Sequence, residues 1–363
     1  MATILERVAW EPSLIDPAPD RALEAYARRK WGMNNPALRY FAPVPWLARA
    51  VVDLHPEYGL LMHVSHRLAG LLALVVSQEN SCRFCYAATR VMLWTQGLSL
   101  TRIQQLEHDL TRADLSPTTL AALAFARSQS RSGPPAAHEA RDAIQRAGFS
   151  VESMKELAFV VGVTDFANRA TTITAVPARG MERMPGRWHM RLLRPLVGRL
   201  VRSRLARGRP APLDRVPAYP YAALVKAYEG SPIAPALGRA LEQMWASPHL
   251  TRRCKLLMLA VVARGLGCDA CVPEIGETLG SEGLSPAVVT QVLTHLDAPE
   301  LDPVERLLVA FARETIWYEP APLQRRARAL RDHLSSEQVL EAIGVAALAN
   351  GLCRMGAIVL DSR

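Results

Sequence analysis

The residues best suited to chemistry in this sequence are two pairs of cysteines. Cys82 and Cys85 form one Cys-x-x-Cys motif, and Cys268 and Cys271 form a second. This spacing lets two sulfurs meet with little strain, and a helix that begins at the motif would stabilise a thiolate through its partial positive charge. A thiolate attacks a peroxide or a disulfide, and the neighbouring thiol resolves the adduct as a disulfide. Both pairs are therefore candidate redox sites.

Two other interpretations of the cysteines are weaker. Four thiolates could hold a zinc ion in a tetrahedral site. However, the motifs lie far apart in the chain, and each lies beside a long apolar stretch instead of in a short zinc knuckle. Free cysteines are also often inert, buried side chains, and we favour that interpretation for Cys254 and Cys353. We expect no metal and no cofactor.

The composition indicates a globular, helical protein. Apolar residues make up 50% of the 363-residue chain and charged residues 21%, a balance typical of folded domains. Alanine, leucine and arginine are abundant and aromatic residues make up only 6%, which favours helix over strand. No apolar run approaches the ~20 residues that span a bilayer, and the first residues lack the pattern of a signal peptide. We expect a cytoplasmic protein.

The formal charge of +9 does not by itself indicate nucleic-acid binding. The basic residues are 39 arginines and only 4 lysines. Such a skew is as typical of a GC-rich genome as of selection for phosphate contacts. We therefore expect no nucleic-acid partner.

The chain repeats itself. When the sequence is shifted so that Cys82 falls on Cys268, the two cysteine pairs coincide. The same shift also aligns His63 with His249, Arg67 with Arg253, Gly97 with Gly283, Pro117 with Pro303, and Phe125 with Phe311. After a four-residue deletion the register changes, and Gly162 aligns with Gly344 and Asn168 with Asn350. These matches predict a tandem duplication. The expected divisions are an N-terminal arm (1–40), a first domain (41–175), an Arg-rich linker (176–217) and a second domain (218–363).

Each repeat has the pattern of successive helices. Apolar residues recur at three- and four-residue spacing before the first cysteine pair, as on one face of a helix: Leu68, Leu71, Leu72, Val75 and Val76. Ser116-Pro117 and Asp302-Pro303 have the pattern of an N-cap followed by proline in the first turn. No segment alternates as a strand would. The sequence predicts an all-α fold, with two helical domains related by a pseudo-two-fold axis.

The linker has a distinct composition. Ten arginines lie between Arg179 and Arg209, against one acidic residue. An apolar stripe runs along the same segment, formed by Leu192, Leu193, Leu196, Val197, Leu200, Val201 and Leu205. A basic amphipathic helix of this kind can lie on an anionic membrane. We favour a connector helix whose stripe packs on protein, so membrane contact is not expected.

Residues 73–99, ALVVSQENSCRFCYAATRVMLWTQGLS, resemble the alkylhydroperoxidase D / carboxymuconolactone decarboxylase family, as do ALAFAR and FVVGVTDFANRA downstream. The resemblance implies two fused alkylhydroperoxidase D-like helical domains that assemble into homo-oligomers. It also implies reduction of a peroxide with electrons from a dithiol reductant. By the same resemblance, Cys85 and Cys271 would be the attacking thiols, and Cys82 and Cys268 the resolving ones.

The sequence departs from the family at the proton relay. The redox branch has a His four residues after the second cysteine and a Glu twelve before the first. Here Thr89 and Ile275 take the His position, and Gly70 and Leu256 take the Glu position. A general base must come from elsewhere. The candidates for the relay are Glu79, Thr89, His63 and His249.

We expect an oxidoreductase that reduces a peroxide or exchanges thiols with a disulfide substrate. The first alternative is a non-catalytic, redox-sensing scaffold that lost the relay, and the second is a decarboxylase-like enzyme without a thiol role. Loss of paired thiols on exposure to peroxide would exclude the second alternative.

We expect the first cysteine pair to be the more reactive. Arg83 between its cysteines favours a thiolate, whereas Asp269 in the second pair disfavours it. Pro273 should delay the start of the second helix and move that pair off its first turn. For the first pair, Asn80 and Ser81 would cap the helix, and the Thr89 hydroxyl could donate to the thiolate.

Overall fold

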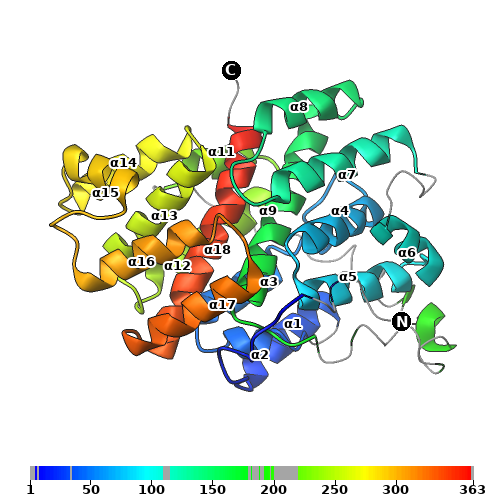
Figure 1. Cartoon of the computed structure of the whole chain (residues 1–363). Coiled ribbons are helices and arrows are strands. Elements are labelled where there is room, and N and C mark those ends of the chain that lie inside the picture. The colour runs from blue at the N-terminus through cyan, green and yellow to red at the C-terminus, as the bar shows by residue number, and fades with distance from the viewer. Residues whose placement is uncertain are drawn as a thin grey trace.

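The fold is all-α, as the sequence predicts. A computed structural model describes residues 5, 8–32, 35–108, 115–178, 181, 188, 192–196, 198–199 and 220–360, and none of these residues lies in a β-strand (Figure 1). The N-terminal helices are α1 (Arg21–Trp31), α2 (Leu38–Phe41) and α3 (Pro45–Asp53).

The two sequence repeats fold into corresponding series of helices. The first repeat (41–175) continues with α4 (His66–Glu79), α5 (Arg83–Thr95), α6 (Leu100–His108), α7 (Pro117–Ser130), α8 (Ala137–Arg146) and α9 (Val151–Ile173). The second repeat (218–363) contains α11 (Ala222–Ala227), α12 (Ile233–Ala246), α13 (Arg252–Leu266), α14 (Cys271–Ser281), α15 (Pro286–His295), α16 (Pro303–Glu314), α17 (Pro320–Ala329), the 3₁₀ helix η3 (Leu330–Asp332) and α18 (Ser336–Val359). Helices α4–α8 lie on one side of the molecule and α13–α17 on the other (Figure 1).

The predicted helix caps are present. Ser116 is the N-cap of α7 and Asp302 is the N-cap of α16, each followed by proline. The Ser116 hydroxyl accepts a hydrogen bond from the Thr119 N–H, and the Asp302 carboxylate accepts one from the Glu305 N–H. These caps satisfy N–H groups that the first turn of a helix leaves free, which is why the two helices begin at equivalent positions of the repeats.

The predicted alignment of the last helices, which pairs Asn168 with Asn350, is wrong. Ser150 caps α9 and Ser335 caps α18, and aligning these two N-caps pairs Asn168 with Cys353 instead. The alignment of the caps also pairs Arg169 with Arg354, and these two side chains make equivalent contacts. The two alignments differ by three residues, which is close to one helical turn of about 3.6 residues. The predicted alignment therefore still paired the same face of α9 with the same face of α18, and both helices are rich in small apolar residues.

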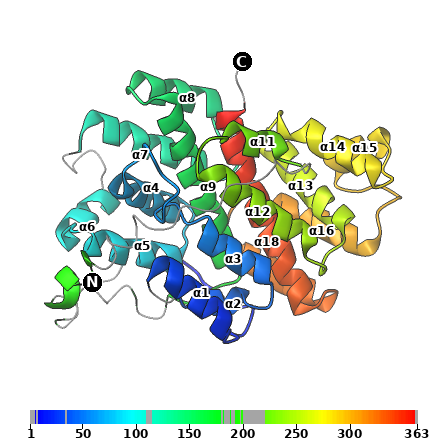
Figure 2. The ribbon, with the colours of Figure 1, turned by 180° about the vertical axis from the view of Figure 1, so that it is seen from behind.

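Helices α9 and α18 cross at the centre of the molecule and make its most extensive contact between elements (Figures 1 and 2). Two glycines meet at the crossing. A Cβ on Gly162 would lie 2.7 Å from the Gly351 carbonyl oxygen, and a Cβ on Gly351 would lie 2.4 Å from the Gly162 oxygen. The backbones therefore approach so closely that neither position has room for a side chain.

A buried ion cluster lies beside this crossing. Asp165 of α9 forms ion pairs with Arg169 of the same helix and with Arg354 of α18, and all three side chains are buried. The Arg169 Nε donates to the Thr315 carbonyl at 3.1 Å, and Arg354 donates to the Gln129 carbonyl. Gln129 and Thr315 occupy equivalent positions when the cysteine pairs are aligned. The arginine of each repeat therefore donates to the equivalent backbone carbonyl of the other repeat. An approximate two-fold relation between the repeats predicts such reciprocal contacts.

The hydrophobic core is continuous across the repeats. One cluster of buried side chains joins α1–α3 to the second repeat, and α3 packs on α12 (Figure 2). A second cluster lies within the first repeat and takes Ala357 and Ile358 from the end of α18. Helix α18 is long and apolar enough to cross a membrane. However, 94% of the 18-residue stretch that is this apolar is buried inside the protein. It is the central helix of the core.

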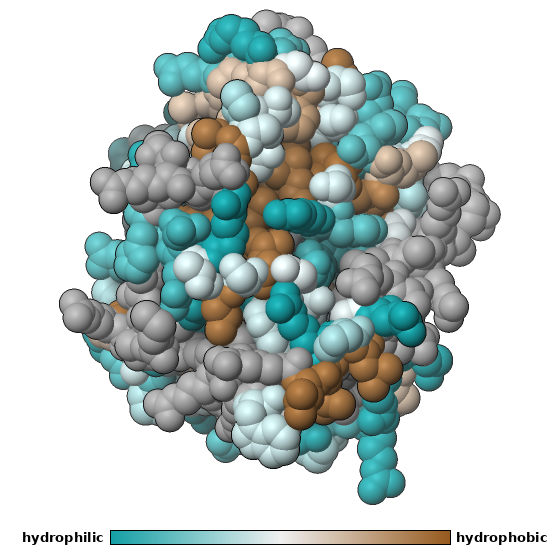
Figure 3. Space-filling view, turned by 90° about the vertical axis from the view of Figure 1, so that its right-hand side faces the viewer, coloured by the Kyte–Doolittle hydropathy of each residue, from teal (hydrophilic) through white to brown (hydrophobic). Residues whose placement is uncertain are grey.

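The predicted docking of the linker's apolar stripe is wrong for the residues that can be described. Leu192, Leu193 and Leu196 lie in a short helical stretch and are 72%, 46% and 66% exposed. Arg194 anchors this stretch instead, because its guanidinium donates to the Trp94 and Leu98 carbonyls at the end of α5. Figure 3 views this side of the molecule and shows a compact apolar cluster near its lower edge. Val197, Leu200, Val201 and Leu205 lie outside the described residues.

We predict that Gly162→Ala destabilises the protein by about 1–3 kcal/mol, because the added Cβ meets a backbone oxygen that cannot move aside. The matched control is Gly280→Ala in α14, where a Cβ would meet nothing within 4 Å. That change should be neutral or should stabilise by about 0.4–1 kcal/mol. Urea unfolding monitored by circular dichroism measures both, and equal effects would contradict the close crossing.

We also predict that Asp165→Asn costs about 3–5 kcal/mol, because two buried guanidinium groups lose their only carboxylate partner among the described residues. The control is Asp297→Asn. It breaks an exposed ion pair with Arg306 and should cost no more than about 1 kcal/mol. Thermal and urea unfolding of the two variants provide the comparison, and a loss below about 1 kcal/mol for Asp165→Asn would show that the cluster is dispensable.

Candidate functional site

The first cysteine pair lies at the start of α5, as expected. Cys82 is the N-cap residue, and its sulfur accepts a hydrogen bond from the Cys85 N–H at 3.3 Å. Both are free thiols, Cys82 fully buried and Cys85 partly exposed. Asn80 and Ser81 are not caps of α5, because Asn80 ends α4 and donates its side-chain amide to Asp165 at 2.9 Å. The sulfur of Cys82 takes the capping role itself.

Cys85 faces a cavity of about 110 Å³ between α3, α4, α5 and α9. The polar or ionisable residues that line it with Cys85 are Asn35, His55, Ser77, Thr89, Thr164, Asn168 and Thr171. The apolar lining includes Trp31, Phe84 and Phe166. A cavity of this size admits a small substrate, and it brings Cys85 but not Cys82 to its wall.

Burial controls the acidity of Cys85. It raises the pKa of this thiol well above its usual value, and the neighbouring Cys82 sulfur raises it further. A hydrogen bond from the Thr171 hydroxyl acts in the opposite direction. The expectation that Arg83 and the helix terminus would produce a net shift toward thiolate is therefore wrong. Arg83 turns toward the Trp10 ring, 5.9 Å from its centroid, and desolvation outweighs the helix dipole.

Of the four relay candidates, only Thr89 lines the cavity of Cys85. Glu79 forms an ion pair with Arg127 at 2.8 Å, with Arg131 3.7 Å away. His63 and His249 lie near acidic residues at the start of the last helix of each repeat, Glu152 of α9 and Glu337 of α18. Backbone hydrogen bonds lower the pKa values of these two carboxyl groups, and the histidines add a smaller effect in the same direction. Neither histidine lies at a cysteine pair.

Two ionisable residues near the site were not identified from the sequence. His55 lines the cavity, and burial lowers its pKa to about 4, so the ring is neutral at pH 7. Its buried Nδ1 has no hydrogen-bond partner in the described part of the chain. Glu57 is buried, and its Oε1 lies 3.2 Å from where a Cβ on Gly70 would be. This carboxyl lies beside Gly70. Both residues lie in the connection before α4, far from the motif, so spacing gave no signal.

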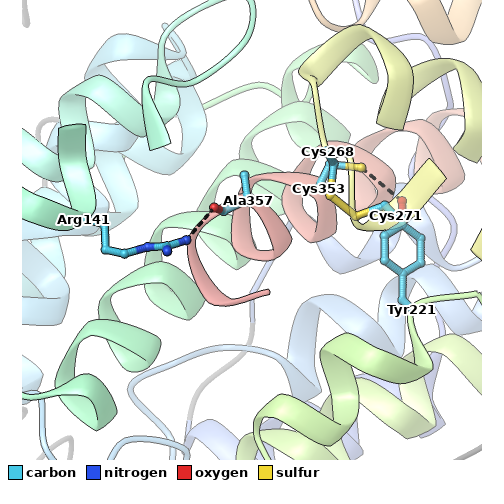
Figure 4. Close-up of a disulfide and its surroundings, with 6 residues drawn as sticks. All are labelled: Arg141, Tyr221, Cys268, Cys271, Cys353 and Ala357. Carbon is cyan, nitrogen blue, oxygen red and sulfur yellow. Dashed lines mark hydrogen bonds between the residues drawn. A yellow bond between two sulfur atoms is a disulfide. The ribbon is translucent and has the colours of Figure 1, made fainter. Parts of the chain in front are cut away.

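The second pair has a different environment. Cys268 and Cys271 form a disulfide and are 1% and 2% exposed. Helix α5 begins at Arg83, and the equivalent residue of the second repeat is Asp269. Helix α14 begins two residues later, at Cys271, so the predicted delay is confirmed. Cys268 lies before the helix, as predicted. The prediction that Cys271 would also leave the first turn is wrong, since Cys271 is the first residue of the helix. The third nearby sulfur is that of Cys353 from α18 (Figure 4).

No family model and no curated protein matches this sequence. Two solved structures resemble parts of the chain. One is the debrominase Bmp8 in complex with 2,3,4-tribromopyrrole, with 19% identity and a TM-score of 0.42 over 48% of this chain and 96% of that one. The other is an uncharacterized peroxidase-related protein from Silicibacter sp. TM1040, with 23% identity and a TM-score of 0.39 over 47% of this chain and 91% of that one.

The buried Glu57 predicts a measurable pH dependence. Burial raises its pKa from 4.5 to about 7, so between these values the folded protein holds a proton that the unfolded chain has lost. The contribution of Glu57 to stability should therefore be full below pH 4.5 and should fall as the pH rises toward 7, by on the order of 3 kcal/mol in total. Glu57→Gln, which stays neutral, should lack this fall. Unfolding free energies of both proteins across this pH range test the assignment, and parallel curves would contradict it.

Proposed function

We propose that this protein is a thiol-dependent oxidoreductase in which the first pair, Cys82 and Cys85, reduces a small peroxide or exchanges with a disulfide. The observation that carries the proposal is the position of Cys85. Its sulfur lies at the wall of a cavity, while Cys82 is buried directly behind it and hydrogen-bonded to the Cys85 backbone. An attacking thiol needs access and a resolving thiol needs only its partner, which supports Cys85 as the attacking thiol and Cys82 as the resolving one, the roles that the family resemblance implies.

The wider assignment is part of the same proposal. We place the chain in the alkylhydroperoxidase D-like group as a tandem duplication, on the sequence motifs and on the reciprocal contacts of Arg169 and Arg354. A dithiol reductant would return the electrons in the reducing cytoplasm expected from the sequence. We also expect the chain to form homo-oligomers.

The proposed chemistry balances with two thiols. The Cys85 thiolate attacks one peroxide oxygen, the O–O bond breaks, and the other oxygen leaves as an alcohol after taking up a proton. The Cys85 sulfenic acid then reacts with the Cys82 thiol to form the disulfide and release water. A dithiol donor reduces this disulfide and is itself oxidised.

We assign the general base to His55. It is the only His, Asp or Glu side chain among the residues that line the Cys85 cavity, and its neutral ring can accept the thiol proton. The Thr171 hydroxyl then stabilises the thiolate through its hydrogen bond. Because burial lowers the pKa of His55 to about 4, His55 is a weak base, and Cys85 stays mostly in its thiol form at neutral pH.

The raised pKa of Cys85 supports one competing function. A thiol that rarely ionises at neutral pH reacts slowly, which suits a redox-sensing scaffold better than a peroxidase with rapid turnover. Such a protein would still form the Cys82–Cys85 disulfide, but without sustained turnover in the presence of a dithiol reductant.

We predict that a small organic peroxide oxidises Cys82 and Cys85 to a disulfide faster than it modifies any other cysteine. Because burial raises the Cys85 pKa, the rate should keep rising above pH 8 instead of levelling near neutrality. Alkylation and mass mapping of the wild type, Cys85→Ser and Cys271→Ser measure the sites. Cys85→Ser should abolish disulfide formation at this pair, whereas Cys271→Ser should leave it intact.

The same assay tests His55. His55→Asn should slow oxidation at pH 7 and should matter less at high pH, where solvent can take the proton. The control is His66→Asn at the start of α4, outside the cavity lining. Oxidation without turnover would favour the sensing scaffold, and no oxidation of either thiol would exclude the thiol function.

A further inference from the structure

Three sulfurs converge in the second repeat. The Sγ atoms of Cys268, Cys271 and Cys353 all lie within 4.8 Å of one another, and all three residues are buried. They come from the connection before α14, from its first turn and from the C-terminal half of α18 (Figure 4). One turn after Cys353 on α18, Gly356 makes room for the pair, because a Cβ there would lie 3.0 and 3.1 Å from the sulfurs of Cys268 and Cys271.

The polar surroundings of the cluster are sparse. The Tyr221 hydroxyl lies 3.1 Å from the Cys353 sulfur and is the hydrogen-bond partner found for it among the described residues. Within those residues no His, Asp or Glu joins the three cysteines as a further potential ligand. The site therefore offers soft sulfur ligands and no imidazole or carboxylate.

We propose that, in the reduced protein, Cys268, Cys271 and Cys353 form a binding site for a thiophilic monovalent cation, Cu(I). Thiolate sulfur selects soft cations, and Cu(I) is fully coordinated by two or three sulfurs. A structural zinc site almost always has four protein ligands, which these three cysteines do not supply. The hard cations calcium and magnesium prefer oxygen ligands and are excluded for that reason.

Binding of Cu(I) through two thiolates and one thiol releases two protons and leaves one net negative charge in the cluster.

The state of the disulfide would control this site. Cys268 and Cys271 are joined in the structure, and opening the bond takes two electrons and two protons, which a dithiol supplies as it becomes a disulfide itself. The same two sulfurs cannot bind each other and the ion together. The cluster would therefore hold copper under reducing conditions and release it on oxidation.

The first repeat lacks the third sulfur. When the N-caps of α9 and α18 are aligned, Cys353 corresponds to Asn168, and Asn168 lines the Cys85 cavity. The proposed copper site thus belongs to the second repeat alone and stands independently of the chemistry proposed for Cys85.

The test uses the full chain with Cys82→Ser and Cys85→Ser, so that the first pair binds no copper. The protein is reduced, desalted without oxygen and titrated with the purple Cu(I)–bicinchoninate complex, whose loss of colour reports transfer of the ion. We expect one Cu(I) per chain. Adding Cys353→Ser should weaken binding at least about tenfold, since even the loss of an outer-shell partner costs that much. The control is Cys254→Ser, a buried free thiol outside the cluster, which should bind as the parent does.

Equal binding by the Cys353→Ser protein, equal losses in both variants, or no transfer to the parent would overturn the proposal. Circular dichroism without copper checks that the variants fold. If the Cys353→Ser protein does not fold, the X-ray absorption spectrum of the copper-loaded parent decides: three sulfur neighbours support the site, and two overturn it.

Discussion

One buried carboxylate holds the two repeats together. Asp165 lies between Arg169 of its own helix and Arg354 of α18, and no member of this cluster is more than 2% exposed. Burying charge without partners is expensive, so the cluster is stable only where both arginines also reach carbonyl groups. Those carbonyls belong to Gln129 and Thr315, at the ends of α7 and α16. The crossing of α9 and α18 is thus fixed by charge as well as by the contact between two glycines.

The same cluster positions the first cysteine pair. Asn80, two residues before Cys82, donates to the Asp165 carboxylate, which fixes the turn that leads into α5. Arg169 also lies over the Tyr318 ring, 4.8 Å from its centroid. Tyr318 comes from the second repeat. Burial raises the pKa of its hydroxyl, and the nearby Cys82 and Cys85 raise it further. The second repeat therefore packs close to the first cysteine pair, although the residues that line the Cys85 cavity all lie between Trp31 and Thr171.

The sequence predicted the features that depend on local rules. The helical content and the caps at Ser116 and Asp302 follow from propensity and capping chemistry. The sequence also placed the first cysteine pair at a helix start, but it named Asn80 and Ser81 as the caps, whereas Cys82 is the N-cap. It did not predict that His55 and Glu57 lie near the site. Tertiary packing brings these residues there, and their distance from the cysteine motif along the chain gives no sign of it. The pKa of Cys85 was misjudged for a similar reason, since desolvation depends on what surrounds the thiol. The register of α18 was misplaced by nearly one turn because small apolar residues align almost equally well in several registers.

The two cysteine pairs show how one helical framework produces two sulfur sites with different access. When the N-caps of the two last helices are aligned, Thr171 of α9 corresponds to Gly356 of α18. Thr171 gives a hydroxyl to Cys85, whereas Gly356 leaves space that both sulfurs of the second pair fill. Asn168 likewise corresponds to Cys353, so a polar amide faces an open cavity in one repeat and a third sulfur closes the other. Two substitutions on one helix face thus accompany the difference between a pair with one thiol at a cavity and a sealed sulfur cluster, together with the later start of α14 at the second motif.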